Sequence, residues 1–587
     1  MTSKTPKFDA AIGKLFDSLT PHEKDCNECG KNFRIESGDI ELLKKLRVCP
    51  PRQCPRCRMR RRMAMMANIL QYYRKDCAAH PNEKVISQMN DAILFKVYDN
   101  NFWWSSDTWD AISFGKKYNP EISFHDQWKE LLLRVPHMAI ERFNKNIINS
   151  EYTADSYDVK NCYLSSSVGM SENISYGVWV AYGNNCADCL RIDHAQYSYE
   201  ITDSDHIYKS KCVRLSTNCT NSAFLFDCHN CQNCFGCVNL RNKNYCFFNE
   251  QLTKEEYQKR VEGIDLGSRS VFEAYSRKFS ELVKEKGIYK ALRMKKSPGA
   301  VGDYLNDCKN CVDVFCAASF QFILTLYKSD NVRHASDIFG ANDSMDVTLF
   351  GPGESSYNVL EGLYANKVVS SYFIQNCFET EYSYECIDCK YCFGCSGLKK
   401  KKFCIFNVQY TEEEYWKTVD EIKARLVDAG TYGEFPPLKD SFFYYHDTYA
   451  YAMMPLTKEE AIAAGARWRK DEVHADTKGI PTISHSDIPD NIKDVKDDIL
   501  GKAILCKKTG RPFRLTPWEL GFYREQKISI PVVCPQERLL NRFRNRESSY
   551  ELYESKCAEC RRDIQTTYDP AKGLRVYCEQ CYQAKVV

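Results

Sequence analysis

The sequence predicts a multidomain α+β protein in which treble-clef-like zinc modules at both ends flank two tandem β-solenoid units with helical caps. Two internal duplications and the spacing of the cysteines predict this class. Adding 480 to residue numbers near the N-terminus gives matching residues near the C-terminus, and adding 158 superposes two copies of a unit in the middle. The 587 residues are enough for several domains, and the 31 Cys, many in close pairs, favour metal ligands or reduced core thiols over disulfides.

Changes in composition divide the chain into six segments. They are a zinc-finger block at 1–110, a helical connector at 111–154, the first solenoid copy with helices at 155–300, the second copy with a helix at 301–455, a linker at 456–500 and a second zinc-finger block at 501–587.

The first block contains two Cys-x2-Cys pairs separated by 24 residues, with the second pair at the start of a helix expected over 58–70. Four thiolates in this arrangement can hold one tetrahedral Zn²⁺, the layout of a treble clef. The predicted ligands are Cys26, Cys29, Cys54 and Cys57.

The second block repeats this pattern but keeps a different site. Its complete set is Cys557, Cys560, Cys578 and Cys581. At its other site Thr509 and Glu537 stand where the first block has Cys29 and Cys57, so we expect that module to rest on its apolar core. The first block has lost most of the complementary site: His80 replaces one cysteine and, when a slip of one or two residues is allowed, Asp99 and Phe102 replace two more. The sequence therefore predicts two zinc ions per chain.

Charge is distributed unevenly. Residues 1–80 carry a net charge of +8 and residues 501–587 carry +7, which leaves about −12 for the middle. Basic side chains cluster around the second cysteine pair of the first block and at its counterpart. This density favours contact with a polyanion, with a solvated basic helix face as the alternative. The predicted nucleic-acid-binding residues are Arg56, Arg58, Arg60, Arg61, Arg62, Arg538, Arg542, Arg544 and Arg546. The aromatic segment 102–109 is interpreted as core, with base stacking as the alternative.

The two middle copies are rich in Asn, Ser, Tyr and Cys. Cys186, Tyr197, Tyr208 and Cys219 are spaced by 11, and later cysteines by 9, which favours a β-solenoid with like residues stacked on successive coils. Helices starting at the capping boxes after Thr253 and Thr411 are expected to cover the ends.

Each copy contains a Cys-x2-Cys-x2-Cys-x2-Cys run, from Cys228 to Cys237 and from Cys386 to Cys395. An interior ladder of thiols accounts for these runs without a metal. A zinc site and an iron–sulfur cluster remain as alternatives.

Several strings resemble a known family. They are Cys-x2-Cys-Gly-Lys-x-Phe at 26–33, Cys-Pro-x-Cys-Arg at 54–58, Cys-Phe-Gly-Cys at 234–237 and 392–395, and Ile-Gln-Thr-Thr-Tyr at 564–568. Over nearly its whole length the chain resembles treble-clef, Cys-x2-Cys-rich zinc-finger proteins of candidate-phylum bacteria and giant viruses. The resemblance implies this architecture and no established activity.

Taken together, these features predict a zinc-stabilised scaffold in which an acidic solenoid body carries two basic heads, the zinc-finger blocks, and the heads bind nucleic acid. RNA is favoured over DNA, and ribosomal RNA is the first candidate. The alternative is a protein-assembly scaffold or a structural component of a large particle. Catalysis is less favoured, because no metalloprotease, phosphate-loop, dinucleotide or nucleophile-elbow motif is found, and no small-molecule substrate is evident. Without a signal peptide or a membrane-spanning apolar run, we expect a reducing, cytoplasmic location, or a virus particle.

Overall fold

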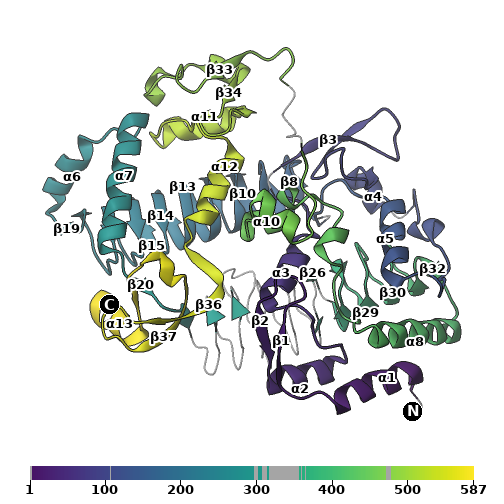
Figure 1. The fold of residues 1–587 in the computed structure, drawn as a ribbon. Helices are drawn as coiled ribbons and strands as arrows, with labels where there is room; N and C mark the ends of the chain where they lie inside the picture. The colour runs from purple at the N-terminus through teal and green to yellow at the C-terminus, as the bar shows by residue number, and fades with distance from the viewer. Residues whose placement is uncertain are drawn as a thin grey trace.

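The computed structural model describes residues 3–295 apart from 70, 106 and 144, residues 365–470 and 477–587, and a few short strands between 302 and 363. These residues form a mixed α/β, multidomain structure with a cysteine cluster near each end, as the sequence predicts (Figure 1). Most of the segment 296–364, which includes the first part of the predicted second solenoid copy, lies outside the described residues. None of the described helices is both long enough and apolar enough to cross a membrane.

A long parallel sheet fills one side of the molecule, from β7 (Ile147–Ile148) to β18 (Cys246–Phe247). Its strands pair with partners twelve residues away, for example Ser166 with Val178 and Val178 with Leu190. Neighbouring strands lie about 4.8 Å apart, so the chain advances by one strand spacing every twelve residues. The spacings of 11 and 9 are therefore wrong as a repeat length. We call each twelve-residue segment a coil, and the sheet over 147–251 the first stack.

The other strands of the first stack are β8 (Thr153–Ala154), β9 (Tyr157–Lys160), β10 (Ser165–Ser175), β11 (Val178–Ala181), β12 (Asn184–Ala187), β13 (Leu190–Tyr208), β14 (Lys211–Arg214), β15 (Thr217–Thr220), β16 (Ala223–Phe226), β17 (Phe235–Val238) and the antiparallel β19 (Glu250–Gln251).

A three-residue rule operates inside each coil. From Asp155 to Phe248, every third residue has a left-handed backbone, with φ between 44° and 67°. Up to Cys237, the residue that follows each of them is inward-facing and buried, as at Cys186, Cys189 and Ile192. Four such steps complete one coil. Asn and Asp tolerate this backbone best, which explains why these residues are abundant in the middle of the chain.

Inward hydroxyls satisfy backbone groups along the first stack. The Ser210 hydroxyl donates to the carbonyl oxygen of Tyr208 at 2.9 Å and accepts from the Ser222 backbone N–H at 3.1 Å. Ser198 and Ser222 make the same pair of bonds one coil earlier and one coil later. Each serine therefore links two coils where the strand ladder is interrupted, and its own buried hydroxyl is paired.

A second stack follows the same rule over 365–409. Phe378 pairs with Lys390 and Lys390 with Lys402, again twelve residues apart. Its strands include β27 (Val368–Val369), β28 (Tyr372–Gln375), β29 (Phe378–Glu381), β30 (Lys390–Phe393), β31 (Lys402–Ile405) and the antiparallel β32 (Val408–Gln409), with the short β25 (Ser356–Tyr357) and β26 (Leu360–Leu363) before them.

Helices follow both stacks as the sequence predicts. The helix α6 (Lys254–Glu262) begins after Thr253 and α8 (Glu412–Asp428) after Thr411, and both predicted capping boxes are confirmed. A longer helix, α7 (Arg269–Lys286), packs on the first stack through Phe272, whose ring lies 5.7 Å from that of Phe224.

The offset of 480 relates the two zinc-finger blocks element by element. In the first block the elements are β1 (His22–Asp25), β2 (Asn32–Ile35), α2 (Ser37–Leu46), α3 (Pro55–Met63), β3 (Tyr73–Asp76), β4 (Lys84–Ser87), β5 (Val97–Tyr98) and α4 (Asn100–Trp104). Their counterparts are β34 (Ala503–Leu505), β35 (Pro512–Phe513), α11 (Pro517–Glu525), α12 (Pro535–Arg544), β36 (Ser548–Lys556), β37 (Asp563–Tyr568), β38 (Val576–Tyr577) and α13 (Glu579–Val586). Both blocks therefore keep one ancestral fold, although each has lost a different ligand set.

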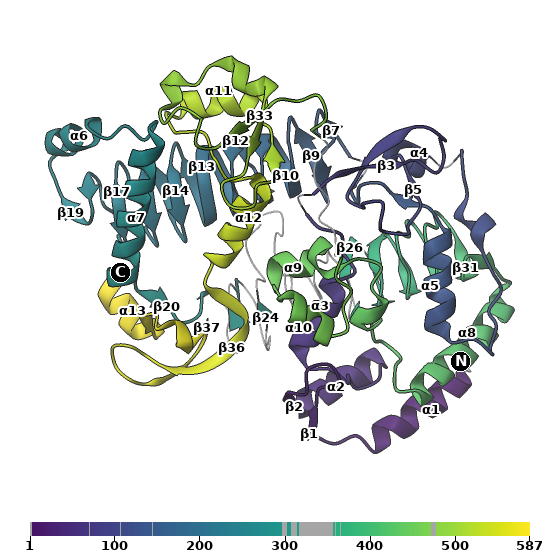
Figure 2. The same cartoon turned by 45° about the horizontal axis from the view of Figure 1, so that its top comes forward.

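Each block packs on the stack that is more distant from it in the sequence (Figures 1 and 2). In the first block, backbone N–H groups at the start of α1 (Pro6–Asp17) donate to Asp420 of α8, and Phe8 donates at 2.8 Å. The second block adds β38 to β20 (Tyr289–Lys290), directly after α7. The chain thus forms two interleaved halves, the first block with the second stack and the second block with the first stack.

A buried carboxylate of the connector 111–154 contacts the second stack. Glu141 accepts hydrogen bonds from the hydroxyls of Tyr372 and Tyr384, the latter at 3.1 Å. Burial raises the pKa of Glu141 to about 8, with the nearby carboxylate of Glu385 as a further cause. Glu385 itself lies 2.9 Å from His137 of β6 (His137–Met138). Burial and the neighbouring carboxylate of Glu385 therefore favour the protonated, neutral form of Glu141.

The two halves also contact one another. Arg56 of α3 forms an ion pair with Glu551 of β36 at 2.8 Å, which brings the two blocks together. Trp179 of the first stack packs against Tyr449 at the start of α9 (Tyr449–Met453), with ring centroids 6.1 Å apart, and against Phe543 of α12 at 5.8 Å. The two zinc-finger blocks therefore meet in the middle of the molecule.

Candidate metal centres

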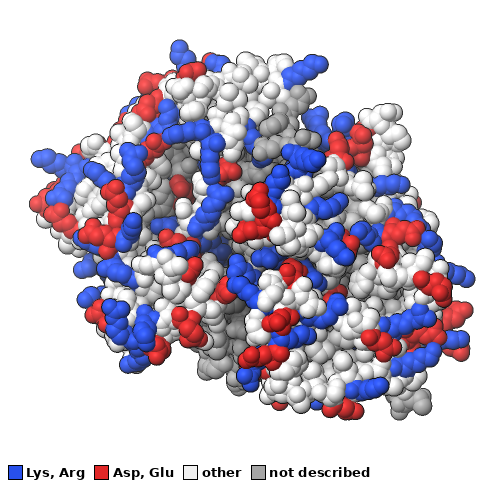
Figure 3. Space-filling view, viewed as in Figure 1, with Lys and Arg blue, Asp and Glu red and all other residues white. Residues whose placement is uncertain are grey.

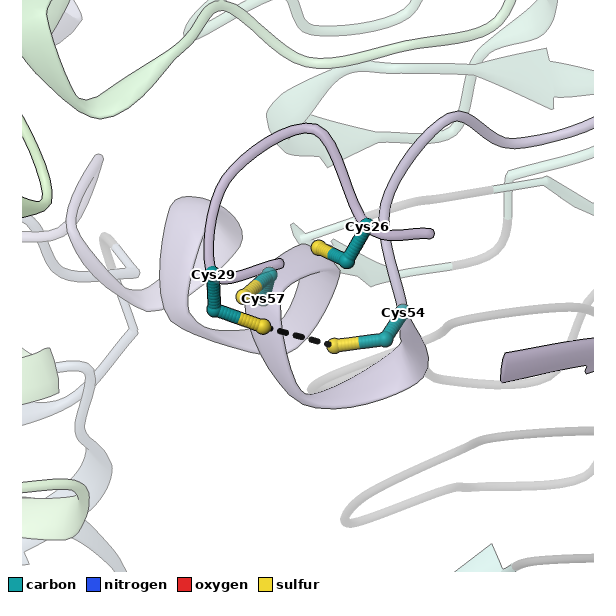
Figure 4. Close-up of side chains that lie close together, drawn as sticks. All are labelled: Cys26, Cys29, Cys54 and Cys57. Atoms are coloured by element: carbon teal, nitrogen blue, oxygen red, sulfur yellow. Dashed lines mark hydrogen bonds between the residues drawn. The ribbon is translucent and has the colours of Figure 1, made fainter. Parts of the chain in front are cut away.

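The four predicted cysteines of the first block converge on one point (Figure 4). Cys26 and Cys29 lie on the turn between β1 and β2, where Gly30 has a φ of 70° and donates its N–H to the Cys26 carbonyl oxygen at 2.9 Å. Cys54 caps α3 and Cys57 lies in its first turn, where the helix dipole favours thiolates. All four sulfur atoms lie within 4.8 Å of one another.

The second block builds the same geometry. Cys557 and Cys560 lie on the turn between β36 and β37, Cys578 caps α13, and Cys581 follows in its first turn. The four sulfur atoms again lie within 4.8 Å of one another. The backbone N–H of Cys578 donates to the Cys557 sulfur at 3.3 Å, a contact that stabilises a thiolate.

Both sets fit a zinc ion. Four ligands placed about 2.3 Å from zinc at tetrahedral angles lie about 3.8 Å from one another. The sulfur atoms of Cys29 and Cys54 are 3.8 Å apart, and so are those of Cys560 and Cys578. One thiol of each set is acidic: a hydrogen bond from Cys57 lowers the pKa of Cys54 to about 5. Burial raises the pKa of Cys557, but backbone N–H groups outweigh it and lower the pKa to about 6.

Charged groups surround the first set. Arg61 of α3 forms an ion pair with Glu28, which lies between the two cysteines of the first pair, at 2.6 Å, and the guanidinium of Arg60 lies 4.0 Å from the Cys57 sulfur. These contacts hold the turn that carries Cys26 and Cys29 against α3, and they place positive charge beside the cysteine sulfur atoms.

The decayed site of the second block is closed by other interactions. Glu537 forms an ion pair with Lys508 at 2.5 Å and lies 3.8 Å from Arg544. Its carboxylate is therefore paired with basic side chains of the same block and is not directed to a metal site. The Thr509 hydroxyl lies 4.0 Å from the Cys534 sulfur. This module packs on a core that includes Leu520, Tyr523 and Ile530, which agrees with the prediction.

The decayed site of the first block is closed by an aromatic ring. Phe102 takes the place of Cys581, and its ring lies 5.0 Å from the imidazole of His80 in an edge-to-face contact. Asp99 caps α4 by accepting from backbone N–H groups. Nearby, Trp103 is fully buried, which supports the interpretation of the segment 102–109 as core.

Most of the nine predicted nucleic-acid-binding arginines point into the protein. Arg58, Arg60, Arg61, Arg62, Arg542 and Arg546 are buried, and the side chain of Arg538 is only 10% exposed. Arg56 and Arg544, with side chains 46% and 47% exposed, are the two that reach the surface.

The arginines of α12 and of the residues just after it bind acidic residues of the first stack. Asp188, which is fully buried, accepts from Nε of Arg538 at 3.0 Å and from Arg542 at 2.7 Å. Arg546 binds Asp203, also in this stack, at 3.0 Å. Asp188 lies 350 residues before Arg538 in the chain, and Asp203 lies 343 residues before Arg546, so no local pattern could have predicted the pairs.

Three further ligand groups meet on the surface of the first stack, at His194, Asp205 and His206. The two histidines are twelve residues apart, and their rings stack with centroids 4.6 Å apart and planes 14° apart. Because the two rings are nearly parallel, their nitrogen lone pairs point in the same direction and do not converge on one ion. The arrangement is therefore better described as ring stacking between successive coils than as a metal site. Knowledge of the twelve-residue repeat would have revealed this pair in the sequence.

Comparison of the chain with protein-family models and with curated protein sequences gives no match. Function is therefore inferred from the geometry of the chain itself.

Proposed function

We propose that this protein is a zinc-stabilised assembly scaffold, in which two zinc-finger blocks are fixed on two β-solenoid bodies that offer rigid faces to protein partners. The solenoid assignment is supported by parallel strands with a constant twelve-residue register in both stacks. Zinc is supported by the two tetrahedral cysteine sets.

The observation that carries this proposal is the use of the arginines. A nucleic-acid-binding head would present its basic helix to solvent. Instead, Arg538 and Arg542 of α12 bind Asp188 of the first stack. Arg546, just after α12, binds Asp203 of the same stack, and Arg61 binds Glu28 within the first block. Removing one partner of a buried ion pair costs about 3–5 kcal/mol, so these side chains are not free to exchange their carboxylates for phosphates. The dense basic runs therefore act as internal clamps.

Nucleic-acid binding, with RNA as the first candidate, remains a second function that one feature supports. Arg56 and Arg544 are half-exposed, on α3 and α12 where the two halves meet. On the face seen in Figure 3, Lys and Arg side chains gather over α12 and around the hollow between the halves. Backbone phosphates would suit such a surface, and their binding would weaken with salt.

The two functions are separated by purification from native lysate with and without nuclease. Protein partners that survive nuclease, with two zinc ions per chain, are the result expected for the scaffold. Recovery of nuclease-sensitive RNA as the main bound species would refute it. Arg56→Glu with Arg544→Glu should then abolish RNA recovery, whereas Arg277→Glu, at an exposed site on α7, should not.

A further inference from the structure

Six buried cysteines gather inside each stack, at positions related by the offset of 158. In the first stack they are Cys219, Cys228, Cys231, Cys234, Cys237 and Cys246, and in the second Cys377, Cys386, Cys389, Cys392, Cys395 and Cys404. Because one inward residue occurs every three positions, the four central cysteines of each set occupy all four inward positions of a single coil.

The remaining two cysteines of each set stack directly on this coil. Cys219 lies one coil before Cys231, since the flanking residues Thr217 and Thr220 pair with residues twelve positions on. On the other side, Cys392 pairs directly with Cys404 in the second stack. Neighbouring thiols influence one another: Cys219, Cys228 and Cys234 lower the pKa of Cys231 far below its usual range. Their counterparts lower that of Cys389 in the same way.

Simple core packing does not account for the match between the two sets. Other inward positions have changed between the copies: Val213 corresponds to Ser371, Ser216 to Ile374 and Leu225 to Ser383. All six thiols have stayed. A buried cysteine that served only as a small apolar filler would exchange for Ser, Val or Ala as its neighbours have done.

We infer that each set of six thiols binds a soft monovalent metal ion, Cu(I) or an ion of the same chemistry, bridged between neighbouring thiolates. Thiolates are the ligands that Cu(I) prefers. Within the part of the chain that the structure describes, three or more ligand atoms come within 4.8 Å of one another only in the two zinc sets and the His194 group. The stack thiols, which the structure describes, form no such group, so they do not offer the four converging sulfur atoms that a tetrahedral Zn²⁺ needs. The register instead places them one above another on successive coils, as Cys392 and Cys404 are, and two stacked thiolates suit a two-coordinate ion.

Binding would exchange thiol protons for the metal. Each inward thiol now donates to backbone carbonyl oxygens, as Cys228 does to those of Phe226 and Cys237, both at 3.5 Å. Loss of the proton frees the sulfur to bind Cu(I), and the proton passes to solvent. No change in oxidation state is involved.

The test uses the full-length, zinc-loaded, reduced chain, titrated without oxygen with Cu(I) from a chelator buffer. Copper and zinc per chain are counted after desalting, and X-ray absorption gives the number of sulfur neighbours of copper. We expect copper uptake with zinc retained at two per chain and about two sulfur neighbours per copper. No uptake, or uptake that displaces zinc one for one, would overturn the inference.

A variant in one stack provides an internal control. Cys228→Ser with Cys234→Ser replaces thiols with the residue found one coil earlier, at Ser216 and Ser222, so the stack should still form. Copper uptake should fall, but by less than half, since the second stack is intact and Cys219 still lies one coil before Cys231 in the first. The matched variant Cys162→Ser, at an inward thiol remote from the set, should bind as much as the unaltered chain. Equal uptake by the double variant and the unaltered chain would contradict the inference. If the double variant fails to fold, the number of sulfur neighbours of copper in the unaltered chain still tests the inference, because a copper ion without sulfur neighbours would overturn it.

Discussion

Replacement of Asp188 by Asn tests the clamp between α12 and the first stack. The Asp188 side chain is fully buried and accepts from Arg538 at 3.0 Å and from Arg542 at 2.7 Å. The Arg538 guanidinium also lies over the ring of Tyr176, 4.7 Å from its centroid. The Asp188→Asn substitution would remove the carboxylate that both buried guanidinium groups contact, a change that costs about 3–5 kcal/mol.

The cost should appear locally, because the molecule has several units and a single unfolding transition is not expected. Opening of α12 would become easier, and each 1.4 kcal/mol corresponds to about tenfold in the opening equilibrium. Hydrogen exchange of the segment 535–544, followed by mass spectrometry, should therefore accelerate by roughly 100-fold or more. Exchange in the second stack should not change.

Two controls accompany this experiment. Asp205→Asn removes a half-exposed carboxylate from the same stack and should leave α12 protected. Adding Arg538→Met and Arg542→Leu to Asp188→Asn removes the unpaired charges and should restore much of the protection. Unchanged exchange of α12 in Asp188→Asn alone would refute the reasoning that the arginines act as internal clamps.

Three further outcomes are expected. Cys54→Ser should lower bound zinc from two ions to one per chain by elemental analysis, and Cys534→Ser at the decayed site should leave the count unchanged. The free energy of unfolding should fall as the pH rises from about 4.5 to 8, because native Glu141 holds its proton up to a pKa of about 8 while the unfolded carboxyl loses it first. Glu141→Gln should remove this contribution, at most about 5 kcal/mol, from the free energy of local opening of the second stack, measured by hydrogen exchange between pH 5 and 8. Ser210→Ala should destabilise the first stack by about 1–3 kcal/mol, measured as faster hydrogen exchange of its strands, because the N–H of Ser222 loses its acceptor.

The parts of the fold that the sequence predicted depend on matching residues at fixed offsets. The offset of 480 placed both cysteine sets and the decayed sites, and every element from β1 to α4 has a counterpart in the second block. Such a prediction needs no knowledge of tertiary contacts, because two copies in nearly the same register share one fold. The two candidate metal sites followed, since their cysteines lie on a hairpin turn and at a helix start within one module.

The parts that the sequence did not predict depend on distant contacts or on an unfamiliar backbone. The twelve-residue repeat was missed because the spacing of 11 combines inward residues such as Cys219 with outward ones such as Tyr208, and the spacing of 9 is only three of the four steps of a coil. The informative signal was the recurrence of Asn and Asp at positions separated by multiples of three, such as Asp155, Asp158 and Asn161, because these residues tolerate a left-handed backbone. The buried state of the arginines was out of reach, since charge density along the chain does not reveal that Asp188 lies opposite α12.

The two blocks have kept different cysteine sets, and the decayed sites show what replaced them. Each complete set lies in a small cluster of its own, with Phe33 in one block and Tyr577 and Tyr582 in the other. At the decayed sites, Phe102 packs on His80 in the first block, and Glu537 pairs with Lys508 in the second. A site whose place is taken by such contacts no longer needs a metal to hold its turn against its helix. Because the two blocks pack against different surfaces, each block could lose a different set.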